Sequence, residues 1–190
     1  MVDALRQNYL AAALEPRRVY RKARGSLDPL ALIPALGLRA GVDPFVLLDG
    51  QGWGGSVLAF DPEWSMTVKD ESPFERLRNL LTGEPGFAHP LDGGPALFGY
   101  LSYDAVRHLE QLPSLARDDL GLPTAQFILP RCTITLAEDE VRVSIPTDED
   151  PAHILRELGR AERLKESSPD PCRAVPRSSL GRDGYVKAVE

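Results

Sequence analysis

Short apolar runs, each followed by a turn signal, recur along the chain and predict β-strands. The runs are rich in Val, Ile, Leu and Phe, and Asp-Pro, Asp-Gly or glycine-rich stretches separate them. Strands are expected at residues 18–23, 45–48, 56–60, 64–69, 125–136 and 140–145. Asp61-Pro62 is expected to be a turn between two of these strands, and Pro130 predicts an edge or a bulge within another. Most of the strands are joined by short turns, which favours antiparallel pairing.

Apolar residues at helical spacing predict helices between or after these strands. The helices are expected at residues 30–38, 73–82 and 151–166, and each begins beside an Asp-Pro or Ser-Pro pair of the kind that starts a helix. Because strands joined by turns alternate with only a few helices, the order of elements indicates an α+β fold. We expect a mainly antiparallel β-sheet with a few flanking helices.

Prolines and polar stretches divide the chain into four parts. Residues 1–16 are helix-prone but end at a proline, and we expect them to form an N-terminal extension. The α+β domain covers residues 17–168, and a Pro- and Ser-rich linker covers 169–178. Residues 179–190 begin a new helix that stops without a C-cap, so we expect them to be the truncated start of a further domain.

Composition narrows the class of protein. The 190 residues are 43% hydrophobic and 26% charged, which is ordinary for a soluble globular domain. A net charge of -6 argues against a nucleic-acid partner, and no apolar run is long enough to cross a membrane. Without a signal peptide, the protein is expected in the cytoplasm. Its two cysteines, Cys132 and Cys172, suggest neither a disulfide nor a metal site.

Residues 93–113, GGPALFGYLSYDAVRHLEQLP, combine glycines, aromatic residues and ordered charges more densely than any other stretch. The pattern predicts a buried strand that turns into a short helix, with Asp104 as the N-cap. His108 has no serine or cysteine nucleophile placed with it, so the segment is expected to be structural rather than catalytic. Six residues recur at regular spacing, and their charges are expected along one helical face. We call them the ordered residues: Gly99, Tyr100, Tyr103, Asp104, Arg107 and Glu110.

This segment resembles a signature of the chorismate-utilising synthases, the family of anthranilate synthase component I and aminodeoxychorismate synthase component I. The signature reads approximately GG-x-x-GY-x-x-YD-x-x-R-x-x-E-x-LP, and the chain supplies the six ordered residues and then Leu112-Pro113 at that spacing. It departs at the front, where Pro95-Ala96 stand in place of the glycine pair. Residues 45–62, 119–127 and 179–190 also resemble the family, so the resemblance covers residues 17 to 190.

The resemblance implies that the chain is the N-terminal, structural and regulatory part of a chorismate-amination enzyme. In the family, a C-terminal catalytic domain binds chorismate and Mg²⁺, and a glutamine amidotransferase subunit or domain supplies ammonia. We therefore expect these two as partners, and expect neither a catalytic residue nor a metal ligand in this chain. The fragment alone is expected to be inactive. The ordered residues of 93–113 are expected to hold the strand–helix junction and to face one of the two partners.

The resemblance also implies an aromatic amino-acid pocket around an LLES-like motif. The motif falls on Leu47, Leu48, Asp49 and Gly50. The Asp49 carboxylate could bind a ligand ammonium group, but Gly50 lacks the serine hydroxyl and Gly54 replaces a cation. Losing a charged hydrogen bond costs about 1.5–3 kcal/mol, so we expect weak tryptophan binding. A plain turn at Asp49-Gly50 is the alternative interpretation.

The altered motif bears on which branch of the family the chain represents. With LLDG in place of LLES, the sequence favours aminodeoxychorismate synthase component I, of p-aminobenzoate and folate biosynthesis. The first alternative is anthranilate synthase component I, of tryptophan biosynthesis. The second is a non-catalytic amino-acid-binding module of the same fold.

Overall fold

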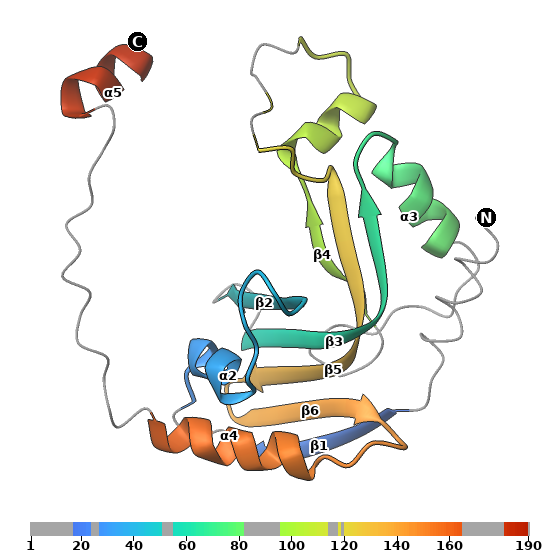
Figure 1. The fold of residues 1–190 in the computed structure, drawn as a ribbon, viewed down its shortest axis with the longest axis vertical. Coiled ribbons are helices and arrows are strands. Elements are labelled where there is room, and N and C mark those ends of the chain that lie inside the picture. The colour runs from blue at the N-terminus through green and yellow to red at the C-terminus, as the bar shows by residue number, and fades with distance from the viewer. Residues whose placement is uncertain are drawn as a thin grey trace.

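The computed structural model describes residues 17–23, 27–50, 55–81, 96–113, 118, 120–164 and 181–189. The expected extension 1–16 and linker 169–178 therefore lie outside the described residues. The described elements, in chain order, are β1 (Arg17–Ala23), α2 (Pro29–Ala35), β2 (Phe45–Gly50), β3 (Gly55–Val68), α3 (Pro73–Leu81), β4 (Phe98–Leu101), the 3-10 helix η3 (Tyr103–His108), β5 (Ala125–Ala137), β6 (Glu140–Pro146), α4 (Ala152–Leu164) and α5 (Gly181–Val189) (Figure 1).

The strands form one six-stranded sheet in which every described pairing is antiparallel. Its order is β1-β6-β5-β3-β2, and β4 pairs with β5 beyond the end of β6. The β5–β6 hairpin turns at Glu138-Asp139, as the sequence predicts. The predicted α+β class, with a mainly antiparallel sheet and a few helices, is confirmed. In the described ranges, no helix has the length and apolar character needed to span a membrane.

The two longest strands, β3 and β5, bend where the sequence predicts a turn (Figure 1). That prediction is wrong: the chain continues as one strand through Asp61, whose φ of 55° is left-handed, and the register shifts between Pro62 and Trp64. Pro62 faces Pro130, and since neither proline has an N–H group, the hydrogen-bond ladder is interrupted here. The predicted irregularity at Pro130 is thus a bulge in the pairing of a central strand.

The bend divides the sheet into two halves. We call the half with β1, β2, β6 and the adjoining parts of β3 and β5 the base. The tip is the other half, made by β4 with residues 64–68 of β3 and 125–129 of β5. In Figure 1, α2 and α4 lie against the base and α3 lies beside the tip.

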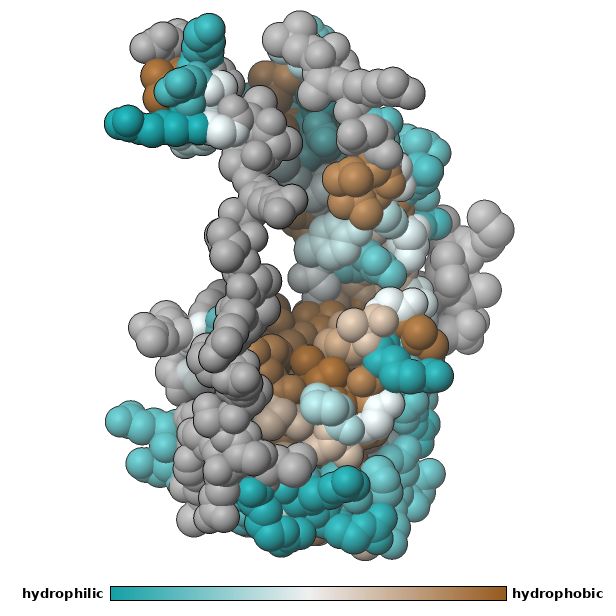
Figure 2. All heavy atoms as spheres, turned by 60° about the vertical axis from the view of Figure 1, so that its left-hand side comes forward, coloured by the Kyte–Doolittle hydropathy of each residue, from teal (hydrophilic) through white to brown (hydrophobic). Residues whose placement is uncertain are grey.

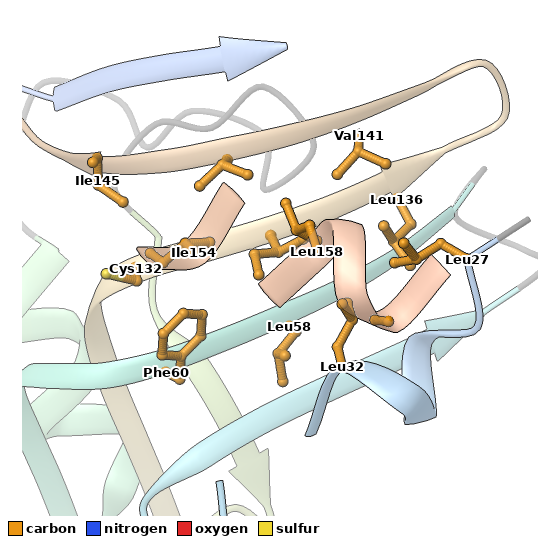
Figure 3. Close-up of a cluster of buried hydrophobic side chains, with 13 residues drawn as sticks. Leu27, Leu32, Leu58, Phe60, Cys132, Leu136, Val141, Ile145, Ile154 and Leu158 are labelled. Atoms are coloured by element: carbon orange, nitrogen blue, oxygen red, sulfur yellow. The ribbon is translucent and has the colours of Figure 1, made fainter. Parts of the chain in front are cut away.

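The main hydrophobic core lies in the base, between the sheet and two helices. Leu32 of α2 and Leu158 of α4 meet Leu58 of β3, and all three side chains are almost completely buried (Figure 3). Burying one such side chain contributes about 1.5–3 kcal/mol. A smaller core in the tip packs Leu80 of α3 against Trp64 and its neighbours. A third cluster, on the opposite face of β3, joins base and tip.

Helix boundaries follow the local sequence signals with small differences. The Asp28 side chain accepts a hydrogen bond from the Leu30 amide at 3.0 Å and caps α2, as the Asp-Pro pair predicts. α2 ends at Ala35 rather than residue 38, because Gly37 takes a left-handed φ of 73°. The Asp150 side chain accepts from the Ala152 amide at 2.9 Å at the start of α4.

Candidate functional site: the strand–helix junction of the tip

Strand β4 brings the ordered residues of the segment to the edge of the tip. Phe98 is buried, and the pairing places Gly99 opposite Phe127 of β5. A Cβ atom on Gly99 would lie 1.9 Å from the Gln126 carbonyl oxygen and 2.7 Å from the Phe127 Cα. No other residue fits at such a close approach of two backbones. Gly99 and Tyr100 are both residues of β4, and Gly99 is the one that allows β4 to pair this closely with β5.

The helix after β4 differs from the predicted one. It is a 3-10 helix whose N-cap is Ser102, not Asp104, and the Ser102 amide donates to the Thr124 carbonyl at 2.8 Å. The helix ends at His108, so Glu110 lies outside it and the predicted row of three charges is broken. A 3-10 helix has three residues per turn, which stacks residues i and i+3 directly. Asp104 and Arg107 accordingly pair, with 2.6 Å between Oδ1 and Nε.

Arg107 also holds the segment that follows the helix. Its Nη1 donates to the carbonyl oxygens of Leu112 at 3.3 Å and Pro113 at 3.1 Å. The guanidinium group thus joins the first turn of the helix to the Leu-Pro end of the signature. Such charge-assisted contacts, fixed by a planar donor, give the exposed segment a defined shape.

The junction presents apolar side chains to the outside. Tyr103 is 91% exposed, and Figure 2 shows apolar side chains on the surface of the upper part of the molecule, where the tip lies. Exposed apolar and aromatic side chains are typical of surfaces that bind another protein or domain. We call this set the tip surface: Tyr100, Leu101, Tyr103, Leu109, Leu112, Leu120 and Leu122, all exposed.

The expected amino-acid pocket lies elsewhere, on the edge strand β2 of the base. Strand pairing continues through Asp49 and Gly50, which face Ser56 and Gly55, so the plain-turn interpretation is wrong. Leu47 packs on the main core whereas Leu48 is exposed, and alternation along the strand sends these two side chains to opposite faces. The four motif residues therefore do not all line one pocket.

A hydroxyl group nevertheless accompanies the Asp49 carboxylate. The Ser56 Oγ donates to Asp49 Oδ1 at 2.6 Å, across the β2–β3 pair. Ser56 is buried, and reasoning from local motif positions missed it, although pairing β2 with β3 through a hairpin would place it there. Asp49 is thus already held by a neutral donor, and its remaining lone pairs face outward.

Other reactive groups of the described chain stand apart from each other. His108 and His153 are exposed, and no group of three metal-binding side chains comes together among the residues that the structure describes. Cys132 is buried in the base, and its burial together with the charges of Glu149 and Asp61 raises the pKa of its thiol to about 12. Such a thiol stays protonated and unreactive at neutral pH.

The fold and the junction define a class: an α+β domain on a bent antiparallel sheet, with a glycine-dependent strand leading into an Asp–Arg-paired helix. A family model for chorismate binding enzymes matches residues 43–190. The match covers most of the chain, and the chain belongs to this family. The resemblance seen in the sequence is confirmed.

Curated relatives refine the comparison. The chain is 34% identical over 142 residues to anthranilate synthase component 1 of Cereibacter sphaeroides, an alignment that covers 62% of this chain and 28% of the relative. It is 46% identical over 127 residues to anthranilate synthase component 1 of Thermus thermophilus, covering 61% and 26%. A third relative of the same name, from Acetivibrio thermocellus, is 26% identical over 147 residues, covering 74% of this chain and 27% of the relative. The chain spans about a quarter of the length of these relatives.

The names of these relatives bear on the branch of the family. All three are anthranilate synthase components, which favours the alternative of the sequence analysis over its main interpretation, aminodeoxychorismate synthase. The main interpretation rests on the LLDG motif, and the names of the relatives do not support it.

Proposed function

We propose that this chain is the N-terminal part of an enzyme of the anthranilate synthase component 1 type. The observation that carries the proposal is the 46% identity over 127 residues to the Thermus thermophilus enzyme. The tip supports it, because residues of the family signature have defined structural roles there: Gly99 allows β4 to pair closely with β5, and Arg107 joins Asp104 to the Leu112-Pro113 segment. The reaction would be the amination of chorismate, with loss of its hydroxyl group as water and of its enolpyruvyl side chain as pyruvate, to give anthranilate.

The chemical step would belong to the remaining part of such an enzyme. Chorismate and Mg²⁺ would be bound by a C-terminal domain corresponding to the portion of the relatives that this chain does not span. Ammonia would come from a glutamine amidotransferase subunit or domain. The role proposed for this chain is to present the tip surface to one of these partners, since its exposed tyrosines and leucines are suited to burial against another domain.

A domain exchange tests the branch. The matched stretch of the Thermus thermophilus enzyme would be replaced by the corresponding residues of this chain, and the same exchange would be made in an aminodeoxychorismate synthase component I. We expect chorismate amination to survive in the anthranilate host and to fall in the other host, because the contacts between the exchanged and the resident parts must fit. Each product is identified by mass, with the unmodified hosts as controls.

Two outcomes would contradict the proposal. One is activity that survives only in the aminodeoxychorismate host, and the other is loss of activity in both hosts although the chimeras fold. The purified 190-residue chain supplies a separate test. Given chorismate, Mg²⁺ and ammonium, it should form no aminated product, and measurable turnover would show that the chemistry does not need the remaining domain.

A further inference from the structure

The bend between base and tip leaves backbone groups that the sheet cannot satisfy. Pro62 and Pro130 face each other without an N–H group between them, and the register shift beside them removes regular pairing. The carbonyl groups of Pro130 and Arg131 lie at this interruption. Buried carbonyl groups that have lost their partner in the sheet require another donor.

Arg17, at the start of the edge strand β1, supplies that donor. Strand β6 lies between β1 and β5 in the sheet, so the Arg17 side chain reaches across β6. Its Nη1 donates to the Pro130 carbonyl at 3.3 Å, and its Nη2 donates to the carbonyl of Arg131. The same guanidinium group is anchored to Ser144 of β6, with 3.0 Å from Nε to Oγ and 3.3 Å from Nη2 to the carbonyl oxygen. One planar group therefore joins β6 in the base to both carbonyls at the bend.

Charges at the bend reinforce the same geometry. Arg131 donates from Nη2 to Glu149 at 2.6 Å, and it lies 3.8 Å from carboxylate oxygens of both Asp61 and Glu63. Asp61 is the residue with the left-handed φ, so the guanidinium group of Arg131 faces the carboxylate at the point where β3 turns. The bend is held from both strands.

We propose that Arg17 is a positioning residue that sets the angle between the base and the tip of the sheet. A change in the angle of the bend would turn the peptide groups at Pro130 and Arg131, so their carbonyls would lose their alignment with a guanidinium group that Ser144 keeps in place. Two directional hydrogen bonds would be weakened together, so a single angle is favoured. The neighbouring Arg18 provides a natural control, because its side chain is exposed and alternation along β1 directs it to the other face.

The test measures the distance between base and tip in the whole chain by double electron–electron resonance. Spin labels are placed by Asn79→Cys in α3 and His153→Cys in α4, both exposed positions, with Cys172→Ser in the background. Cys132 can remain, since its buried thiol has a pKa of about 12. The native chain should give one narrow distance distribution, whereas Arg17→Ala should shift it or broaden it about twofold, and Arg17→Lys, which keeps only a point charge, should lie between them.

The outcomes separate positioning from simple stabilisation. If Arg17 only fastened β1 to the sheet, Arg17→Ala would lower the melting temperature and leave the base-to-tip distance unchanged, which would overturn the proposal. Arg18→Ala should alter neither distance nor width, and a comparable broadening in that variant would also overturn it. Should Arg17→Ala fail to fold, Arg17→Lys decides: an unaltered distribution in that folded variant counts against a positioning role.

Discussion

The base and the tip share two strands but treat their apolar residues differently. In the base, the sheet residues that face α2 and α4 are buried almost completely, as with Leu58 and Ile134. In the tip, α3 covers one face, while the β4–η3 junction leaves Tyr103 and several leucines exposed. The base therefore buries the apolar side chains that face its helices, although Val19 and Leu48 of its edge strands are exposed, whereas the junction of the tip leaves most of its apolar side chains exposed.

This difference indicates a division of roles. Full burial makes the base a source of stability, since each large side chain removed from water contributes about 1.5–3 kcal/mol. In the tip, the close backbone approach at Gly99 and the Asp104–Arg107 ion pair fix the shape of an exposed segment. A surface that is exposed but held in a fixed shape is suited to binding, because little entropy is lost when a partner covers it.

Adding a methyl group to Gly99 should have the largest effect on the tip. Gly99→Ala places a Cβ 1.9 Å from a backbone carbonyl oxygen, so β4 must leave β5 or distort it, and we expect a loss of at least about 3 kcal/mol. Gly55→Ala makes the matching clash in the base, 2.2 Å from the Leu136 carbonyl oxygen. Chemical denaturation gives both unfolding free energies.

A glycine with free space around it serves as the control for both variants. A Cβ on Gly159 of α4 would find its nearest atom at 3.8 Å, so Gly159→Ala should be neutral or stabilise by about 0.5–1 kcal/mol. If Gly99→Ala proved as harmless as Gly159→Ala, β4 would not depend on close backbone approach, and the description of the junction would be wrong.

Removing a leucine side chain should lower the unfolding free energy much more in the base than in the tip. Leu158→Ala opens a cavity in the main core and should cost about 2–5 kcal/mol. Leu109→Ala, in a side chain that is 66% exposed, should change the unfolding free energy by less than about 0.5 kcal/mol. Thermal and chemical unfolding of the two variants measure the contrast, and a large loss for Leu109→Ala would mean that the tip buries its leucines within this chain.

The sequence predicts those elements that depend on neighbours in the chain. Many strands and helices follow from apolar periodicity and from local caps such as Asp28. The errors, in the base as well as in the tip, occur where distant pairing overrides local preference. Asp61-Pro62 is a bulge because Pro130 faces it, and Asp49 stays in a strand because Ser56 pairs with it.

The same reason explains the candidate site. The signature residues were found from spacing, but the role of Gly99 depends on the backbone of β5, which no local pattern reveals. Asp104 is expected from its residue type to cap the helix, yet Ser102 occupies the N-cap position, where its amide donates to the Thr124 carbonyl of the segment before β5. Contacts between strands far apart in sequence thus decide what the signature does.

Tryptophan binding should respond moderately to changes at the β2 edge of the base. The native chain should bind tryptophan weakly, since residues 47–50 do not all lie on one face of β2. Asp49→Asn should weaken binding about tenfold by removing the charged partner of the ligand ammonium. Gly50→Ser is the control and should leave the affinity unchanged, because alternation along β2 sends a side chain at this position to the opposite face. Isothermal titration calorimetry measures the three affinities. Tight binding by the native chain, or no response to Asp49→Asn, would contradict this prediction.

The smallest effect is expected at Arg107, and it should appear in local order rather than in global stability. The Arg107 side chain is 35% exposed, so solvent weakens its pairing, and Arg107→Ala should cost no more than about 1 kcal/mol. Residues 109–113, however, lose the donor that binds the Leu112 and Pro113 carbonyls, and the amides of residues 109–112 should exchange hydrogen faster. Arg76→Ala, which breaks the exposed pair with Glu71 at 3.2 Å, is the matched control and should leave that exchange unchanged. Equal protection of residues 109–112 in both variants would show that the tip surface keeps its shape without Arg107.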